Sequence, residues 1–180
     1  MFISQPNERE PVPVADSWKR LEKWLAANVP EITLQPGCSD TELGFFEKEF
    51  GVTLPDDVKQ SFRLHNGQSC DIYPGAIAGE WLDPIERVRD SLSIWRSLYE
   101  EEQESDSGFG ERATSFPPDA IRCEYATPGW IPLLNTQDGN NCGVDLNPGP
   151  SGVYGQVINF GRDEDDKYVL GLVGRISWRT

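Results

Sequence analysis

The strongest constraint on the fold is a change of hydrophobic period at Trp130. After this residue the chain consists of four short β-type runs, which cover residues 130–134, 143–146, 155–160 and 168–173. The segments between these runs are short and rich in Asn, Asp, Gly and Pro. Parallel neighbours need a crossover of roughly a dozen residues or more, so we predict that the runs form an antiparallel meander.

Before this point the apolar residues recur at helical spacing. A first helix is predicted from Ser17, with Trp18 and Leu25 on its apolar side. The polar, proline-containing residues 1–15 are expected to form a flexible tail, since proline disfavours a helix there. Residues 16–180 are expected to form a single domain, because this length suits one core.

Two short helices are predicted between residues 39 and 67. Ser39 and Glu42 form a capping box that opens the first of them. Pro55 suits the first helical position of the second, which Asn66-Gly67 is expected to close.

A longer amphipathic helix is predicted over residues 85–99, after the cap and proline at Asp83-Pro84. Residues 99–111 carry six acids and are predicted to be a solvated loop. Helices followed by a meander indicate an α+β fold, with N-terminal helices packed on a mostly antiparallel sheet.

The net charge of −14 limits the classes of partner. Nucleic acids and anionic membranes are poor partners for a polyanion, because binding to phosphates needs cationic side chains. Concentrated acidity would instead accelerate encounters with basic proteins. The alternative is that the acidic composition only confers solubility.

The four cysteines are far apart in the sequence and include no C-x-x-C pair. We therefore expect no zinc site, and we expect free thiols in a cytoplasmic protein. Two disulfides in a secreted protein are the alternative. The N-terminus has no apolar export segment, and no 18-residue apolar run indicates membrane insertion.

Catalytic residues are not indicated. His65 is the chain's one imidazole, and its place at a helix end favours a structural role in which the ring satisfies terminal carbonyls. No Gly-x-Ser-x-Gly, dinucleotide-binding or P-loop motif is found. A glycosidase stays open as an alternative, because paired carboxylates are numerous. We predict a protein that is not an enzyme and that has no cofactor.

Oxygen ligands gather at residues 138–141 and at Asp145, as a calcium site would require. Their spacing does not match the calcium-loop motif, however. We predict a tight hairpin turn at this point and no metal.

Two acidic segments are the candidate partner-binding sites. The first is a predicted turn between the last two strands: Asp163, Glu164, Asp165 and Asp166. The second lies in the acidic loop: Glu100, Glu101 and Glu102. Acids fixed by a hairpin lose little entropy when they bind a basic partner. The alternative is that the turn at residues 163–166 is only solvated and has no role in binding a partner.

Several stretches, in this order, carry a family resemblance. They are the helix at Trp18, a run with Leu54, Pro55, Asn66 and Gly67, the run that starts with Trp130 and Pro132, and a run with Asp145, Pro148 and Gly155. Over residues 17–170 they resemble the SUKH superfamily, which includes fungal cell-wall assembly regulators, killer-toxin-resistance proteins and many bacterial immunity proteins.

The resemblance implies helices packed on an antiparallel sheet, with structural roles for these residues. In particular, Asp145 is expected to hydrogen-bond backbone amides of a neighbouring turn. Family members usually end in a helix with an aromatic-Trp-Leu signature, which this chain lacks beyond Trp178. We therefore expect the C-terminal helix to be shortened or absent.

Two functions follow from the resemblance. The first is an immunity protein that neutralises a cognate basic toxin, such as a nuclease. The alternative is a regulatory interaction module like the fungal relatives, which carry long disordered tails. We expect the first function, since this chain is compact. The sequence does not indicate an oligomeric state.

Overall fold

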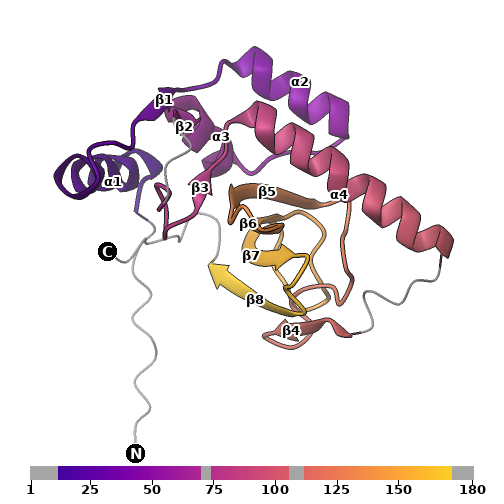
Figure 1. Ribbon diagram of the computed structural model, residues 1–180. Coiled ribbons are helices and arrows are strands. Elements are labelled where there is room, and N and C mark those ends of the chain that lie inside the picture. Colours follow the sequence, from indigo (N-terminus) through magenta and orange to yellow (C-terminus); the bar gives the residue numbers. More distant parts are fainter. Residues whose placement is uncertain (1–11, 70–73, 106–111, 172–180) are drawn as a thin grey trace, which may run out of the picture.

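The computed structural model describes residues 12–69, 74–105 and 112–171, and these contain four helices and eight strands (Figure 1). Three of the helices come early in the chain, and the long sheet strands come late. The larger sheet is antiparallel apart from one edge pair. The predicted α+β class is therefore confirmed.

The larger sheet has six strands in the order β3-β5-β6-β7-β8-β4. Their bounds are Trp81–Leu82 for β3, Thr114–Phe116 for β4, Trp130–Asn135 for β5, Asn140–Asp145 for β6, Gln156–Gly161 for β7 and Asp166–Gly171 for β8. The predicted meander corresponds to β5 through β8, which pair antiparallel in sequence order. The parallel pairing of β4 with β8 was not predicted.

A second, two-stranded sheet joins β1, Leu34–Pro36, to β2, His65–Gln68. The sequence did not predict these strands. His65 and Asn66 therefore begin a strand directly after a helix, where we had expected a helix end. The pairing that makes them a strand comes from residues thirty positions away, so local patterning gave no sign of it.

The helices are α1 Val14–Asn28, α2 Asp40–Phe50, α3 Asp56–Leu64 and α4 Ile85–Ser105. The capping box of α2 is confirmed, since Ser39 Oγ accepts from the Glu42 amide and the Glu42 carboxylate accepts from the Ser39 amide. Pro55 is the N-cap of α3, one position before the predicted one.

Helix α1 begins at Val14, with Pro13 as its N-cap, and not at Ser17. A proline is tolerated there because the first turn of a helix leaves its amides unpaired in any case. Residues 1–11 of the predicted tail lie outside the described residues.

Helix α4 continues to Ser105, so the prediction of a loop from residue 99 is wrong as far as residue 105. Glu and Gln are good helix formers, and a run of acids on a solvated helix looks like a loop in composition. Residues 106–111 lie outside the described residues, as do residues 172–180, where the prediction of a shortened or absent terminal helix falls.

Two of the three apolar clusters attach α2, α3 and α4 to the sheet. In the first, Leu43 of α2, Val58 of α3 and Leu92 of α4 pack with Ile131 and Val144 of the sheet. The second packs Trp95 against residues of β5 and β7, which are Trp130, Ile158 and Phe160. Figure 1 shows α2 and α4 above the sheet, with α1 to one side. No helix among the described residues is long and apolar enough to cross a membrane.

Candidate functional site

The fold brings the two predicted acidic segments to one end of the molecule. Glu102 of α4 and Asp163 of the β7–β8 turn both act electrostatically on the phenol of Tyr125. Glu102 also acts on the Lys167 ammonium, as do Glu164 and Asp165. Segments some sixty residues apart in the sequence therefore share one electrostatic environment. We call this region, residues 100–104 with 163–166, the acidic end (Figure 1).

Most carboxylates of the acidic end face solvent. Exposed members are Glu100, Glu101, Glu104, Asp163, Asp165 and Asp166, whereas Glu102 and Glu164 are half-buried. Asp166 is the first residue of β8, so the turn proper is shorter than the predicted tetra-acidic one. Asp163 forms an ion pair with Arg162 at 3.0 Å, which leaves its charge partly neutralised.

A buried lysine anchors the turn of the acidic end. The Lys167 side chain is only 2% exposed, and its ammonium lies 5.0 Å from the centre of the Trp130 ring. Its Nζ donates a hydrogen bond of 2.9 Å to the backbone oxygen of Glu164. Burial lowers the pKa of Lys167, and the neighbouring charges of Asp165 and Glu164 act in the opposite direction.

Asn159 of β7 completes this anchor. Its Nδ2 donates to the Glu164 carboxylate and, at 3.0 Å, to the backbone oxygen of Asp166. Its Oδ1 accepts from the amide of Tyr168 at 2.5 Å. The turn is thus held from both sides by residues that the sequence did not single out, and its exposed acids have a fixed backbone beneath them.

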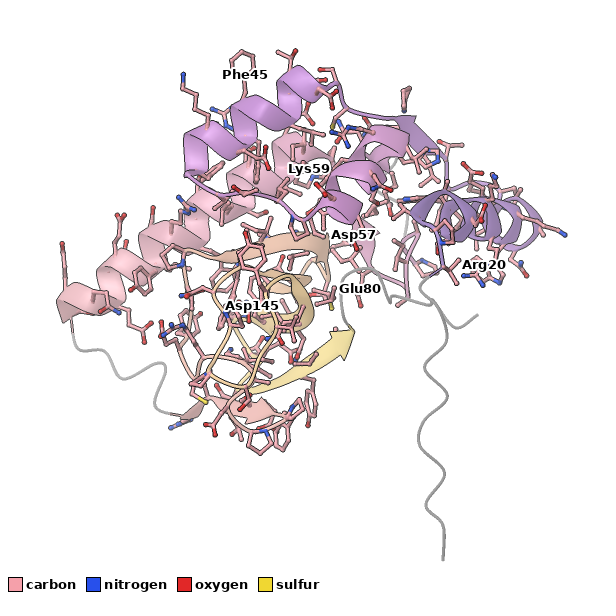
Figure 2. The ribbon with its side chains drawn as sticks, turned by 180° about the vertical axis from the view of Figure 1, so that it is seen from behind. Arg20, Phe45, Asp57, Lys59, Glu80 and Asp145 are labelled. Carbon is pink, nitrogen blue, oxygen red and sulfur yellow. The ribbon has the colours of Figure 1, made fainter. Side chains whose placement is uncertain are left out.

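Asp145 lies buried beside the turn that follows β6. It has no exposed surface, and its Oδ1 accepts from the Asn147 amide at 2.8 Å. Its Oδ2 accepts from Gln156 Nε2 at 2.9 Å, and the same nitrogen donates to the Ala120 carbonyl at 2.8 Å. Burial raises the pKa of Asp145. Figure 2 shows this residue among the strands, whereas Phe45 of α2 points away from the body.

The other residues of the resemblance lie in the core or in tight turns. Trp18, Leu54, Trp130 and Pro132 are buried, and Pro55 and Pro148 are half-buried. Gly155 has a positive φ of 84° and donates its amide to the Asp145 carbonyl at 2.8 Å. A structural role for these positions stays a prediction from the resemblance.

Asn66 and Gly67 connect β2 to the start of α4. Asn66 Oδ1 accepts from the Ile85 amide at 2.7 Å, which satisfies one of the free amides of the first helical turn. A Cβ on Gly67 would lie 2.4 Å from the Pro84 nitrogen, so only glycine allows this approach.

His65 joins α1 to the small sheet. Its Nε2 lies 2.7 Å from a Glu22 oxygen, and its Nδ1 lies 3.2 Å from the Gln35 carbonyl oxygen. Its ring packs against Trp18 with centroids 4.7 Å apart. The partners are therefore not the helix-end carbonyls that we expected, although the role is structural.

The oxygen ligands around Asp138 form the β5–β6 turn, as predicted. Its Oδ1 accepts from Thr136 Oγ1 and, at 3.2 Å, from the Asn140 amide, and the Thr136 bond lowers the pKa of Asp138. Within residues 12–69, 74–105 and 112–171, no three His, Cys, Asp or Glu residues are placed to hold a metal.

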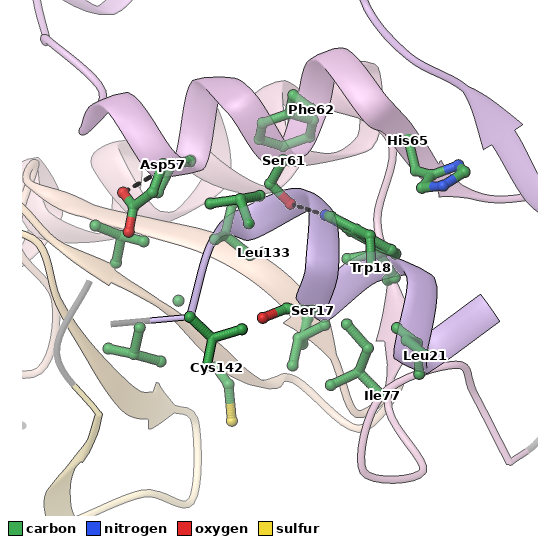
Figure 3. Close-up of a pocket in the computed structure, with 18 residues that line it drawn as sticks. Ser17, Trp18, Leu21, Asp57, Ser61, Phe62, His65, Ile77, Leu133 and Cys142 are labelled. Carbon is green, nitrogen blue, oxygen red and sulfur yellow. Dashed lines mark hydrogen bonds between the residues drawn. The ribbon is translucent and has the colours of Figure 1, made fainter. Parts of the chain in front are cut away.

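An apolar cavity of about 140 Å³ lies between α1, α3 and the sheet (Figure 3). Its walls include Trp18 and Leu21 of α1, Phe62 of α3, and Val144 and Val157 of the sheet. Polar groups at its edge come from Ser17, Asp57, Ser61, His65 and Cys142. Burial raises the pKa of the Cys142 thiol to about 11, so this thiol is protonated at neutral pH.

Sequence reasoning missed this cavity and the buried Lys167. The described cavity walls come from seven helices and strands, and no local pattern predicts their convergence. The burial of Lys167 follows from strand alternation: its neighbours Asp166 and Tyr168 point to solvent, so Lys167 points to the opposite face of the sheet.

Residues 37–171 match the model of the SMI1 / KNR4 family (SUKH-1). The chain is 40% identical over 169 residues to the "Cell wall biosynthesis/cell cycle regulator smi1" of Schizosaccharomyces pombe, a match that covers 89% of this chain and 34% of that protein. It is 35% identical to the "Glucan synthesis regulatory protein" of Neurospora crassa, covering 87% of this chain and 35% of that protein.

A third relative is the "Cell wall assembly regulator SMI1" of Saccharomyces cerevisiae, at 31% identity over 86% of this chain and 37% of that protein. The chain thus spans about a third of the length of these relatives. Compactness therefore does not separate the two predicted functions. The names of the relatives favour the alternative prediction, a regulatory module, over the toxin-neutralising one.

Proposed function

The chain belongs to the SMI1/KNR4 (SUKH-1) family, and on this basis we propose that it is a non-enzymatic protein-binding domain of a cell-wall assembly regulator. The observation that carries the proposal is the 40% identity, over 89% of the chain, to a protein named as a regulator of cell-wall biosynthesis and the cell cycle. A toxin-neutralising role stays a prediction from the resemblance.

The internal contacts of the domain support binding without catalysis. The His65 ring is engaged by Glu22 and Gln35, and the deepest carboxylate, Asp145, is engaged by a backbone amide and a glutamine. These groups hold the fold together, while six carboxylates of the acidic end face solvent.

We propose that the partner is a basic protein that contacts the acidic end. Charge complementarity of this kind raises association rates and sets the orientation of the encounter. Lys167 and Asn159 keep the turn in place, which lowers the entropy lost on binding. A cytoplasmic location is part of this proposal, supported by the free thiols of Cys38, Cys123 and Cys142.

A domain exchange tests the proposed function. The region of the Schizosaccharomyces pombe regulator that matches this chain would be replaced by it, and resistance of the cells to a wall-digesting glucanase would be measured. We expect resistance close to that of cells with the natural regulator. A chimera with Val88→Asp, which places a charge at a fully buried position, is the non-folding control.

A chimera that accumulates to normal levels but leaves cells as sensitive as the control would contradict the proposal. Restoration by the chimera, and its loss in a variant neutralised at Glu101 and Asp165, would support both the regulatory role and the acidic end as its contact surface.

A further inference from the structure

Two exposed aromatic rings stack on each other where β4 pairs with β8, at one edge of the larger sheet (Figure 1). Phe116 of β4 and Tyr168 of β8 are register partners, and their ring centroids lie 4.9 Å apart with planes 15° from parallel. Phe116 is 40% exposed and Tyr168 is 45% exposed, and neither belongs to an apolar cluster of the core. The pair therefore offers the negative faces of aromatic rings to a group that approaches from solvent.

The same face of β8 continues this apolar surface. Side chains two positions apart along a strand point to one face, so Leu170 lies on the side of Tyr168 and opposite the buried Lys167. Leu170 is 55% exposed. Single exposed apolar side chains are common, whereas neighbouring ones often mark a contact surface. We call Phe116, Tyr168 and Leu170 the ring patch.

The charge beside the ring patch selects a cationic occupant. Asp166 lies on the same face of β8, two positions before Tyr168, which is about 6.6 Å between Cα atoms. Its carboxylate is exposed, and none of the ion pairs within residues 12–69, 74–105 and 112–171 includes it. Asp166 also belongs to the acidic end, so the ring patch borders the surface to which we assign a basic partner.

Arginine suits this combination of groups better than lysine does. Its guanidinium is planar, stacks on aromatic rings and pairs with a carboxylate through two parallel hydrogen bonds. The lysine ammonium is a strongly hydrated point charge, so it gains less from an exposed ring. The hydrocarbon stem of arginine can in addition cover an apolar side chain such as Leu170.

The backbone beneath the ring patch is held in place from β7. Asn159 accepts a hydrogen bond of 2.5 Å from the amide of Tyr168, and it donates one of 3.0 Å to the backbone oxygen of Asp166. The strand that carries the ring and the carboxylate is therefore fixed before a partner arrives, which lowers the entropy lost on binding.

We propose that the ring patch binds an arginine side chain of the basic partner, with the guanidinium stacked on an aromatic ring and paired with Asp166. This inference rests on the proposed function, because it needs a basic protein at the acidic end. It adds which side chain of that protein is recognised and which residues of this chain recognise it.

Two peptides of equal length and charge separate stacking from charge attraction. The probes are fluorescent octaarginine and octalysine, and their dissociation constants for the full chain are measured by fluorescence anisotropy in about 20 mM salt. We expect octaarginine to bind about fivefold more tightly than octalysine, because only the guanidinium gains both the ring and the paired carboxylate.

Substitutions locate the preference for arginine. Phe116→Thr with Tyr168→Thr removes both rings and no charge, and threonine suits a strand, so the ratio of the two dissociation constants should fall below about twofold. Phe45→Ala removes an exposed ring of α2 and is the matched control, which should keep the ratio. Asp166→Asn should lower the ratio about threefold, whereas Asp165→Asn, which removes an exposed charge from the adjacent turn, should keep it.

Equal binding of the two peptides by the full chain would overturn the inference, and so would a fivefold ratio that survives the removal of both rings. If tryptophan fluorescence shows that the double ring variant does not fold, Asp166→Asn and Asp165→Asn decide, and equal ratios in these two would overturn the inference. A dimer in sedimentation equilibrium that the double ring variant loses would assign the ring patch to a second copy of the chain and would also overturn it.

Failure of the proposed function has a different signature. In that case the chimera described above leaves cells sensitive to glucanase, although the fivefold preference for octaarginine is present. Failure of the inference alone leaves the chimera active, with octaarginine and octalysine bound equally.

Discussion

Asp145 and Gly67 show how single residues fix the loops of this domain. Asp145 ties the turn after β6 to Gln156 of β7, and Gln156 in turn holds the carbonyl of Ala120. Gly67 lets β2 pass close to Pro84 at the start of α4. In each case one side chain, or the lack of one, joins segments that are distant in the sequence.

Asp145→Asn should lower the free energy of unfolding by about 1–3 kcal/mol. The amide offers one acceptor and one donor where two acceptors are needed, so one buried donor, at Asn147 or Gln156, loses its partner. Urea unfolding followed by tryptophan fluorescence at pH 7 measures the difference.

The difference in free energy of unfolding between the parent protein and Asp145→Asn should widen as the pH falls. Burial raises the pKa of Asp145, so between the ordinary carboxyl pKa and the raised one the folded state binds more protons than the unfolded state. Its contribution to the stability of the parent protein then increases as the pH falls through this window. The substituted amide does not titrate, so the gap measured at pH 4.5 should exceed that at pH 7. A narrowing gap would contradict this account.

Gly67→Ala should lower the free energy of unfolding by about 2 kcal/mol or more. The residue has a positive φ of 81°, and an added Cβ would lie 2.4 Å from the Pro84 nitrogen. Gly44→Ala is the matched control: it lies within α2, and apart from the adjacent backbone of this helix no atom lies within 4 Å of the new Cβ, so it should stabilise by about 0.5–1 kcal/mol. Equal melting temperatures for the two variants would argue against the close approach.

At the scale of elements, α1 is attached differently from the other helices. Helices α2, α3 and α4 share one apolar cluster with the sheet, whereas α1 is attached by Leu25, by Trp18 and by the pairing of Glu22 with His65. The Trp18 Nε1 donates to Ser61 of α3 at 2.9 Å. Helix α1 is therefore the helix whose loss would leave most of the core intact.

Trp18→Ala should release α1 selectively. The substitution removes a buried indole, a loss of about 3 kcal/mol or more, most of which falls on the contact between α1 and α3. Amide hydrogen exchange should accelerate in residues 14–28, while β5 to β8 keep their protection. Trp24→Ala, at 38% exposure, should leave both sets of amides unchanged. Uniform acceleration across the sheet would mean that α1 is part of the global core.

The sequence predicted those elements that depend on neighbours in the chain. The capping box of Ser39 and the short turns between β5 and β8 are local, and both were confirmed. The pairs β1–β2 and β4–β8 join segments some thirty to fifty residues apart, and three-residue strands carry too little periodicity to be recognised.

The candidate site was predictable only in its parts. The acidic residues near positions 101 and 164 were identified from composition, yet their convergence depends on how α4 lies against the sheet. The cavity depends on the packing of α1 over Val144 and Val157, which helical spacing cannot place. The end of α4 was misassigned because acidic helices and acidic loops have similar compositions.

On the scale of the whole molecule, many cations are already paired. Lys59 pairs with Glu47, Arg63 with Asp40, and Arg89 with Glu49, all on or near the helices. The acidic end has the buried Lys167 beneath it and the paired Arg162 beside it. Because the chain has thirty acidic and sixteen basic residues, the electrostatic potential at the acidic end should therefore be strongly negative.

A basic probe should distinguish the acidic end from the rest of the surface. The double variant Glu101→Gln with Asp165→Asn removes two charges from the acidic end, and Asp90→Asn with Asp119→Asn removes two exposed charges elsewhere. In 20 mM salt, binding of a fluorescent octalysine peptide should weaken about fivefold in the first and less than twofold in the second. The difference in octalysine binding between the two double variants should disappear in about 0.3 M salt, because the salt screens the attraction between the peptide and the carboxylates. Equal weakening of binding in both double variants would show that octalysine responds to the net charge alone. This result would contradict the proposal that the acidic end is the contact surface.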